Sequence, residues 1–144
     1  MSLTNTHETN LLSLIFDNVD WANIGDSSGL QNSATDGSLY VSLHTSDPGE
    51  TGSDSNEISG YSYARQAVSR TDGWSISSNT ADNAAAITFP AATGSWGTVT
   101  HFGIHYASTG TGNMVFYGAL TSSKTIGNTD VLEIATGDLD ITIT

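Results

Sequence analysis

The spacing of apolar residues divides the chain into two regions that meet near residue 38. In the first region, apolar side chains recur every three or four positions, as they do on one face of an α-helix. These side chains are Leu11, Leu14, Ile15, Val19 and Ala22. Asn5 followed three residues later by Glu8 is typical of a helix start. We therefore predict one helix, from about Thr6 to Asn18, with Asn5 as its N-cap.

The residues after this helix have the composition of a loop. The segment Asp26–Gly37 is rich in Ser, Asn, Asp and Gly and has almost nothing to pack. The helix has a wide apolar face, because Leu12 and Phe16 extend it, and such a face must be buried against something. We therefore predict that residues 1–37 form a helix and loop that serve as an assembly arm.

Beyond Ser38 the apolar residues alternate with polar ones, which is typical of β-strands. The first strand carries Leu39, Val41 and Leu43 on one face, and its other face carries Tyr40, Ser42 and His44. The segment Thr98–Tyr106 has the strongest strand pattern. The Gly-rich turn Ala107–Asn113 connects it to a second apolar segment, Met114–Leu120. We expect these two strands to form a hairpin.

Shorter strands complete the pattern. We predict them at Tyr61–Arg70, Trp74–Ser77, Ala85–Phe89, Val131–Ile134 and Leu139–Ile143, with a turn at Ser78–Asn83. About eight strands at roughly ten-residue spacing favour an all-β fold, an antiparallel β-sandwich domain over residues 38–144. A jelly roll is the leading topology, because its eight strands form two sheets. An immunoglobulin-like sandwich of about seven strands is the alternative.

The charge of the chain excludes two classes of partner. Fifteen acidic residues face Arg65, Arg70 and Lys124, which gives a net charge of −12 and a pI near 4.1. Three scattered cations cannot form the basic surface that binds nucleic-acid phosphates or an anionic membrane. No stretch approaches the roughly 18 apolar residues of a membrane span. We expect no nucleic acid and no membrane as partners.

Candidate metal ligands are present but do not form a metal-binding pattern. His101 and His105 share a strand face at a separation of about 13 Å, which is too far for one metal ion. The loop Thr45–Gly60 concentrates the oxygen ligands that calcium prefers, at Asp47, Glu50, Asp54, Asn56 and Glu57. Their spacing is not that of an EF-hand, so we expect a solvated loop. The sequence predicts no metal site and no cofactor.

The sequence also contains no catalytic motif, although it has many carboxylates. Asp138 with Asp140, and Asp130 with Glu133, are nominal carboxylate pairs of the kind that a glycosidase needs. The chain has no cysteine, no Gly-x-Ser-x-Gly elbow and no phosphate-binding Gly loop followed by Lys. We expect no enzymatic activity.

Five segments together carry a resemblance to a known family. They are Leu43–Glu50, Gly60–Arg65, Phe89–Ala92, Trp96–Ile104 and Tyr117–Thr121. As a series they resemble small virion proteins of tailed phages and prophages, usually labelled tail-fibre or structural protein. The likeness covers most of the chain from residue 38 onward and includes the N-terminal helix. Its motifs consist of turn and strand residues, so they imply a family without implying a reaction.

The resemblance implies a building block of the phage particle, made in the host cytoplasm and located in the virion. We expect a homo-oligomer, with a trimer as the expected state, whose partners are the major capsid protein or tail proteins. Head decoration as a cement protein is the preferred role, because one short β domain lacks the long repetitive stalk of a fibre. The alternative is a tail-fibre or baseplate component that contacts host-surface glycans.

Aromatic and charged residues bear on these two roles. Trp21, Trp74 and Trp96 could stack on sugar rings, although aromatic residues more often fill a core or a subunit interface. Arg65 should make a specific interaction with a carboxylate of its own or a neighbouring subunit. We therefore predict that Leu11, Ile15, Trp21 and Arg65 contribute to the interface between subunits.

Overall fold

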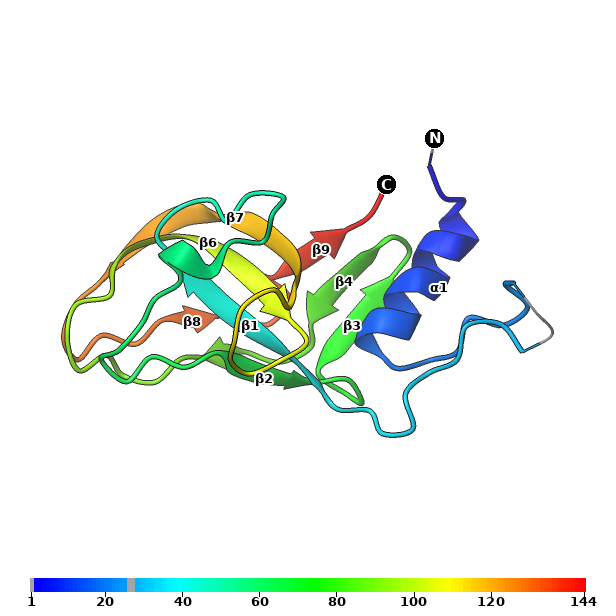
Figure 1. The fold of residues 1–144 in the computed structure, drawn as a ribbon, viewed down its shortest axis with the longest axis horizontal. Coiled ribbons are helices and arrows are strands. Elements are labelled where there is room, and N and C mark those ends of the chain that lie inside the picture. The colour runs from blue at the N-terminus through cyan, green and yellow to red at the C-terminus, as the bar shows by residue number, and fades with distance from the viewer. Residues whose placement is uncertain (1, 26–27) are drawn as a thin grey trace. The chain divides into compact units, whose positions relative to one another are not determined.

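The computed structural model describes residues 2–25 and 28–144. These residues form one α-helix, one short 3-10 helix and nine β-strands (Figure 1). In chain order they are α1 (Asn5–Phe16), β1 (Ser38–His44), η1 (Asp54–Asn56), β2 (Gln66–Ser69), β3 (Trp74–Ser77), β4 (Thr80–Asn83), β5 (Ile87–Thr88), β6 (Gly97–His105), β7 (Met114–Ile126), β8 (Glu133–Ile134) and β9 (Asp140–Thr142). Within the same residues, no helix is long and apolar enough to cross a membrane.

The chain forms two compact units. The first unit comprises Met1–Ser38, Val68–Ala86 and Ile134–Thr144, and the second comprises Leu39–Ala67 and Ile87–Glu133. The predicted division of the chain after residue 37 falls next to a change of unit. Strands β3, β4 and β9, however, fold with the N-terminal segment and not with the other strands.

The strands form three sheets within the described residues. The strand orders are β2-β1-β6-β7, β3-β4-β9 and β5-β8. Strand β6 pairs antiparallel with β1 and β7, and β4 pairs antiparallel with β3 and β9. The predicted all-β class, with antiparallel sheets and one N-terminal helix, is therefore confirmed. The jelly roll is not confirmed, because that topology places its strands in two sheets.

In the first unit, α1 packs against strands β3 and β4 (Figure 1). Leu12 and Phe16 are fully buried on this face of the helix, and the Phe16 ring meets Trp74 edge-on at 4.6 Å between ring centroids. The hydroxyl of Thr9 also donates to the carbonyl of Ser78 at 2.6 Å. Part of the apolar face that the sequence predicts is therefore covered by strands of the same unit.

The helix begins one residue earlier and ends two residues earlier than the sequence predicts. The carbonyl of Thr4 accepts hydrogen bonds from His7 and Glu8, so Thr4, and not Asn5, is the N-cap. At the other end, Asn18 adopts a φ of 56°, a left-handed conformation that ends a helix. The Asn18 side chain is buried and bonds both Ser33 and Asp36, so the predicted loop is anchored at this point.

Arg70 holds the C-terminal end of α1. Its guanidinium donates to the carbonyls of Leu14 and Ile15, each at 2.6 Å, and to the carbonyl of Asp36 at 3.1 Å. The last carbonyls of a helix have no partner within the helix and carry partial negative charge. One cation from a distant part of the sequence therefore satisfies the end of the helix and links it to the loop.

Several predicted strand and turn boundaries differ from the structure, three of them substantially. The segment predicted as a turn, Ser78–Asn83, contains strand β4, because pairing on both sides overrides its polar composition. The predicted strand Tyr61–Arg70 shortens to β2, because Tyr61 and Ser62 have φ of 48° and 67°. Strand β7 continues past the predicted Leu120 to Ile126. The hairpin of β6 and β7 is confirmed by their register.

Strand β7 lies at the edge of the four-stranded sheet. It is the longest strand among the described residues, with 13 residues, and most of its side chains from Thr121 to Thr125 are Ser or Thr and exposed. Lys124 is the one charged residue in this exposed segment. Lysine is a residue that commonly prevents an exposed strand edge from pairing with another chain.

Replacing Arg70 with alanine should lower the free energy of unfolding by about 1–3 kcal/mol, because buried and half-buried carbonyls lose their donor. Arg70→Lys should recover only part of this loss, since one ammonium cannot span the same carbonyls. The measurement is urea unfolding followed by circular dichroism. Lys124→Ala removes the same charge from an exposed site and should stay within about 0.5 kcal/mol of the wild type. Equal effects of the two alanine variants would contradict the role of Arg70.

Candidate functional site

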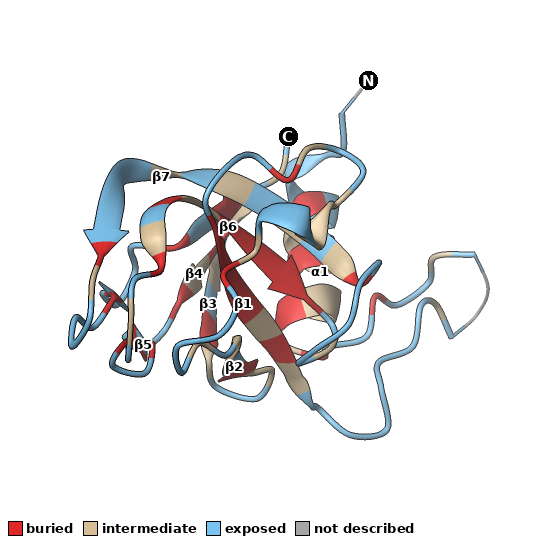
Figure 2. Cartoon of the chain, turned by 60° about the vertical axis from the view of Figure 1, so that its left-hand side comes forward, coloured by how far each residue is buried: buried red, intermediate tan, exposed pale blue. Residues whose placement is uncertain are grey.

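The candidate site lies in the second unit, on one face of strands β1 and β6. Val41 and Leu43 are fully buried on one face of β1, as the alternation predicts. The other face is buried as well: Ser42, His44 and His105 of β6 are each 0% exposed. Figure 2 shows buried residues along both β1 and β6. Polar groups that are removed from water in this way need hydrogen-bond partners.

Gly103 provides the space that these side chains occupy. It lies directly opposite Ser42 in the register of β1 and β6. A methyl group at Gly103 would lie 2.7 Å from Ser42 Oγ and 3.1 Å from His105 Nε2. The rings of His44 and His105 stack with centroids 6.4 Å apart and an interplanar angle of 8°. The missing side chain therefore allows two buried imidazoles to meet across Ser42.

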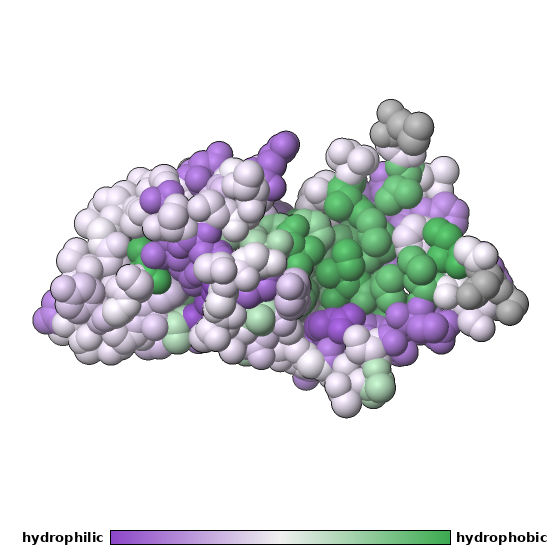
Figure 3. Space-filling model, viewed as in Figure 1, coloured by the Kyte–Doolittle hydropathy of each residue, from purple (hydrophilic) through white to green (hydrophobic). Residues whose placement is uncertain are grey.

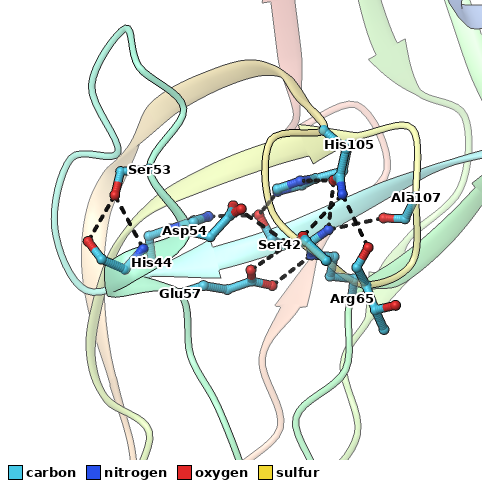
Figure 4. A network of polar contacts seen from close by, with 12 residues as sticks. Ser42, His44, Ser53, Asp54, Glu57, Arg65, His105 and Ala107 are labelled. Carbon is cyan, nitrogen blue, oxygen red and sulfur yellow. Dashed lines mark hydrogen bonds and ion pairs between the residues drawn. The ribbon is translucent and has the colours of Figure 1, made fainter.

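A buried ion pair covers this face (Figure 4). Arg65 donates from Nε to Glu57 Oε1 at 2.8 Å and from Nη2 to Glu57 Oε2 at 2.7 Å. The side chains of Arg65 and Glu57 are 4% and 13% exposed. Such a forked pair is shorter and stronger than a neutral hydrogen bond, and it fixes the orientation of both groups.

The remaining donors of Arg65 all reach the 107–113 loop. The guanidinium donates to the carbonyls of Ala107 and Gly110 and to Asn113 Oδ1 at 2.9 Å. Glu57 in turn accepts from the Tyr63 hydroxyl at 3.0 Å, and the oxygen of that hydroxyl accepts from the backbone N–H of Leu43. The predicted Arg65–carboxylate interaction is confirmed, and its partner belongs to the same chain.

The protons of the two histidines can be assigned from their partners. Asn113 donates from Nδ2 to the carbonyls of Thr109 and Gly110, so its Oδ1 is an acceptor. His105 Nδ1 lies 2.7 Å from this oxygen and must carry the proton. His105 Nε2 then accepts from Ser42 Oγ at 2.8 Å, and Ser42 Oγ accepts from His44 Nε2, also at 2.8 Å. This chain of bonds leaves the lone pair of His44 on Nδ1.

Three acceptor atoms of the site have no hydrogen-bond donor among the described residues. They are His44 Nδ1 and both carboxylate oxygens of Asp54, and all three atoms are buried. The Asp54 side chain is 8% exposed, and its nearest cation is Arg65 Nη2 at 3.6 Å. A buried acceptor without a donor costs free energy. On this side the cluster therefore has more acceptor atoms than donors.

Burial and charge set the protonation states of the cluster. Burial lowers the pKa of His44 and of His105, so both imidazoles are neutral near neutral pH. Burial alone would raise the pKa of Glu57, but the Arg65 guanidinium and the Tyr63 hydroxyl outweigh it, and the pKa is lowered. Burial, together with the Glu57 charge, raises the pKa of Tyr63. Glu57 is therefore ionised beside two neutral imidazoles.

The geometry brings together three residues of metal-binding type. One ligand atom each of His44, Glu57 and His105 lies within 4.8 Å of the other two. An open groove of about 540 Å³ is lined by Asp54, Glu57, Tyr63 and Arg65 on one side and by the 108–111 loop on the other. The sequence missed this set for two reasons. The pairing of β1 with β6 brings His44 and His105 to the same side of Ser42, and an isolated bridge places Glu57 beside His44.

Ser42, His105 and Asn113 also follow the order of a nucleophile, a base and an orienting group. In a hydrolase, however, the nucleophile must be reachable by the substrate. Ser42 is 0% exposed and its oxygen already bonds both imidazoles. In this structure the arrangement serves as a buried hydrogen-bond network.

The comparisons with known proteins were made on the whole chain. The family model described as "Podophage GP4 fiber I protein gp80" matches residues 2–142. The chain belongs to the Gp80 family. A comparison with curated proteins gives no match. The predicted resemblance to tailed-phage virion proteins is thereby confirmed, and this Gp80-family chain is a phage fibre or structural protein located in the virion.

The four predicted interface residues of the Gp80-family chain differ in their exposure to solvent. Leu11 and Ile15 are half-buried on α1, whereas Trp21 is 6% exposed and Arg65 is enclosed by its own network. Their role between subunits stays a prediction. Trp74 and Trp96 are each 5% exposed, so none of the three tryptophans offers an exposed platform for sugar rings.

The acidic groups that the sequence singled out do not form carboxylate pairs across the groove. Asp130 accepts from the backbone of Gly127, and Glu133 accepts from Thr88. Asp140 lies opposite Asp82 in the register of β4 and β9. Burial raises the pKa of Asp82, and the Asp140 carboxyl raises it further through a hydrogen bond and through its charge.

Breaking the buried ion pair should destabilise the protein strongly. Arg65→Met leaves Glu57 as an unpaired buried charge and should lower the free energy of unfolding by about 3–5 kcal/mol. Adding Glu57→Gln to this variant should recover part of the loss, because the charge is then absent. Chemical denaturation of the single and double variants measures both effects. A single variant within about 1 kcal/mol of the wild type would show that the pair is dispensable.

The carboxyl pair of β4 and β9 should make stability depend on pH. A raised pKa means that the folded state binds the Asp82 proton more tightly than the unfolded state does. This group's contribution to stability is therefore greatest below pH 3.8, the ordinary pKa of Asp82, and it declines as the pH rises through the raised value.

Removing the neighbouring charge should make this decline smaller, because burial of Asp82 remains. Asp140→Asn should stabilise the protein at neutral pH by about 0.2–1 kcal/mol, as expected for like charges on facing strand residues. Thermal unfolding between pH 3 and pH 7 measures the effect. Asp138→Asn removes an exposed charge outside the strands and is the matched control. An Asp140→Asn variant that is less stable than the wild type at pH 7 would contradict the interpretation.

Proposed function

We propose that this Gp80-family chain is a structural subunit of the phage fibre and that it acts by association and not by catalysis. The description of the family supports a fibre role. The observation that carries the proposal is an apolar surface on the first unit, which we call the α1 surface. It consists of the outer side of α1 and the residues around the helix.

The α1 surface exposes large apolar side chains to solvent. Leu3, Val19 and Leu30 are 39%, 52% and 45% exposed, and Leu11, Leu14 and Ile15 on α1 are half-buried. Figure 3 shows apolar side chains gathered over this part of the molecule. The opposite face of α1 already packs against β3 and β4. Contiguous apolar surface of this kind marks a site of association.

The charge of the chain indicates the nature of the partner. With a net charge of −12, copies of the chain repel one another at long range, so association must come from short-range apolar burial. We propose a second copy of this chain or a neighbouring fibre subunit as the partner. The expected trimer stays a prediction, as does the major capsid protein as an alternative partner.

Labelling of intact particles distinguishes the fibre role from head decoration. An antibody or a gold-labelled tag on this chain should mark a few positions at the tail, because a particle carries few fibres. Dense labelling over the whole head would overturn the fibre proposal and would support the cement role. Cryo-electron microscopy of the same particles gives the copy number at each position.

Polar substitutions on the α1 surface should weaken association without unfolding the protein. The double variant Val19→Ser, Leu30→Ser should reduce the affinity between subunits by about tenfold or more, because burial of each side chain contributes about 1.5–3 kcal/mol. Sedimentation velocity and incorporation into particles measure the effect. Val131→Ser changes a side chain of the second unit with the same 52% exposure and is the control. An unchanged double variant would contradict the role of this surface.

A further inference from the structure

We propose that His44, His105 and Glu57 form a binding site for a divalent transition-metal ion of the zinc type. This inference goes beyond the fibre role and does not depend on it. The three residues come from the end of β1, the end of β6 and the segment just after η1, and one ligand atom of each lies within 4.8 Å of the others. The identity of the ligands, their hydrogen bonds and the position of Glu57 at the groove support the proposal.

The type of ligand selects the class of ion. Two imidazole nitrogens and one carboxylate oxygen suit zinc, cobalt and nickel, whereas calcium and magnesium prefer sites made entirely of oxygen atoms. The hydrogen bonds of the cluster leave each histidine one ring nitrogen with a lone pair, Nδ1 of His44 and Nε2 of His105. His105 is also oriented by the bond from its Nδ1 to Asn113, which is the kind of outer contact that metal-binding histidines make.

Glu57 keeps one position free for an ion. A carboxylate offers about four lone-pair positions, and Arg65 and Tyr63 together occupy three of them. These donors also fix the direction of the remaining position. Arg65 therefore orients Glu57, in the way that hydrogen-bonded outer groups orient carboxylate ligands.

The cluster has acceptor atoms that its own donors do not reach. His44 is 0% exposed and the Asp54 side chain is 8% exposed, and His44 Nδ1 and both Asp54 oxygens have no hydrogen-bond donor in the described part of the chain. Arg65 is the one cation paired with both carboxylates, with Nη2 2.7 Å from Glu57 Oε2 and 3.6 Å from Asp54 Oδ1. A bound divalent ion would add positive charge beside these acceptors.

Glu57 connects the cluster to solvent. Together with Asp54 and Arg65 it lines the open groove of about 540 Å³, whereas neither histidine is among the lining residues, so an ion would enter past the Glu57 carboxylate. Binding also requires a local change: the bond of 2.8 Å between Ser42 Oγ and His105 Nε2 must break, because the other ring nitrogen of His105 carries its proton.

The test uses the full chain without an affinity tag, treated with a chelator and then titrated with ZnCl₂. We expect one zinc ion per chain by elemental analysis after desalting, and a thermal midpoint raised by about 5 °C at saturating zinc. Imidazole nitrogen signals in NMR spectra should shift for His44 and His105 and stay unchanged for His7 and His101. This measurement needs no substitution, so it does not depend on the folding of a variant.

Variants provide the second arm of the test. His44→Gln and His105→Gln should weaken zinc binding by at least about tenfold, whereas His101→Gln should leave it unchanged. His101 is a suitable control because it lies on the same strand as His105 and bonds the neighbouring Thr100. The proposal is overturned if the wild type takes up no zinc in a saturable manner, if His7 or His101 shifts in place of the cluster, or if CaCl₂ stabilises the protein more than ZnCl₂ does.

Discussion

The ion pair of Arg65 and Glu57 is the interaction on which the second unit depends. Both groups are almost completely removed from water, so each would be unstable there without the other. The remaining Arg65 donors reach the 107–113 loop, and Glu57 also binds Tyr63. One pair thus holds together segments that are distant in the sequence and covers the buried histidines of β1 and β6.

Much of the fold could be predicted from the period of the apolar residues. The alternation in β1 and β6 predicted their apolar faces, and the helical spacing predicted α1 to within two residues at each end. Strand β4 was not predicted, because its polar residues are held by pairing with β3 and β9 and not by their own propensity. The grouping of β3, β4 and β9 with the N-terminal segment depends on contacts that no local pattern reveals.

The candidate site was predictable only in part. The rarity of cations correctly indicated that Arg65 would bind a carboxylate, but the same reasoning could not choose Glu57 among 15 acidic residues. The proximity of His44 to His105 could not be predicted, since it depends on strand register and on the absent side chain of Gly103. The buried polar face of β1 was the missed signal. Alternation shows which residues share a face, but it does not show that a loop covers the polar one.

The exposed edge of β7 could pair with other chains before the protein is assembled into the particle. A virion protein must avoid pairing through its sheet edges before it is built into the particle. Strand β7 offers 13 residues of backbone at a sheet edge, and Lys124 is a charge on that edge. Two of the three cations of the chain hold its own carbonyls and carboxylates, and this third one guards against premature polymerisation through the backbone. An exposed lysine makes pairing of this edge with a strand of another molecule less favourable.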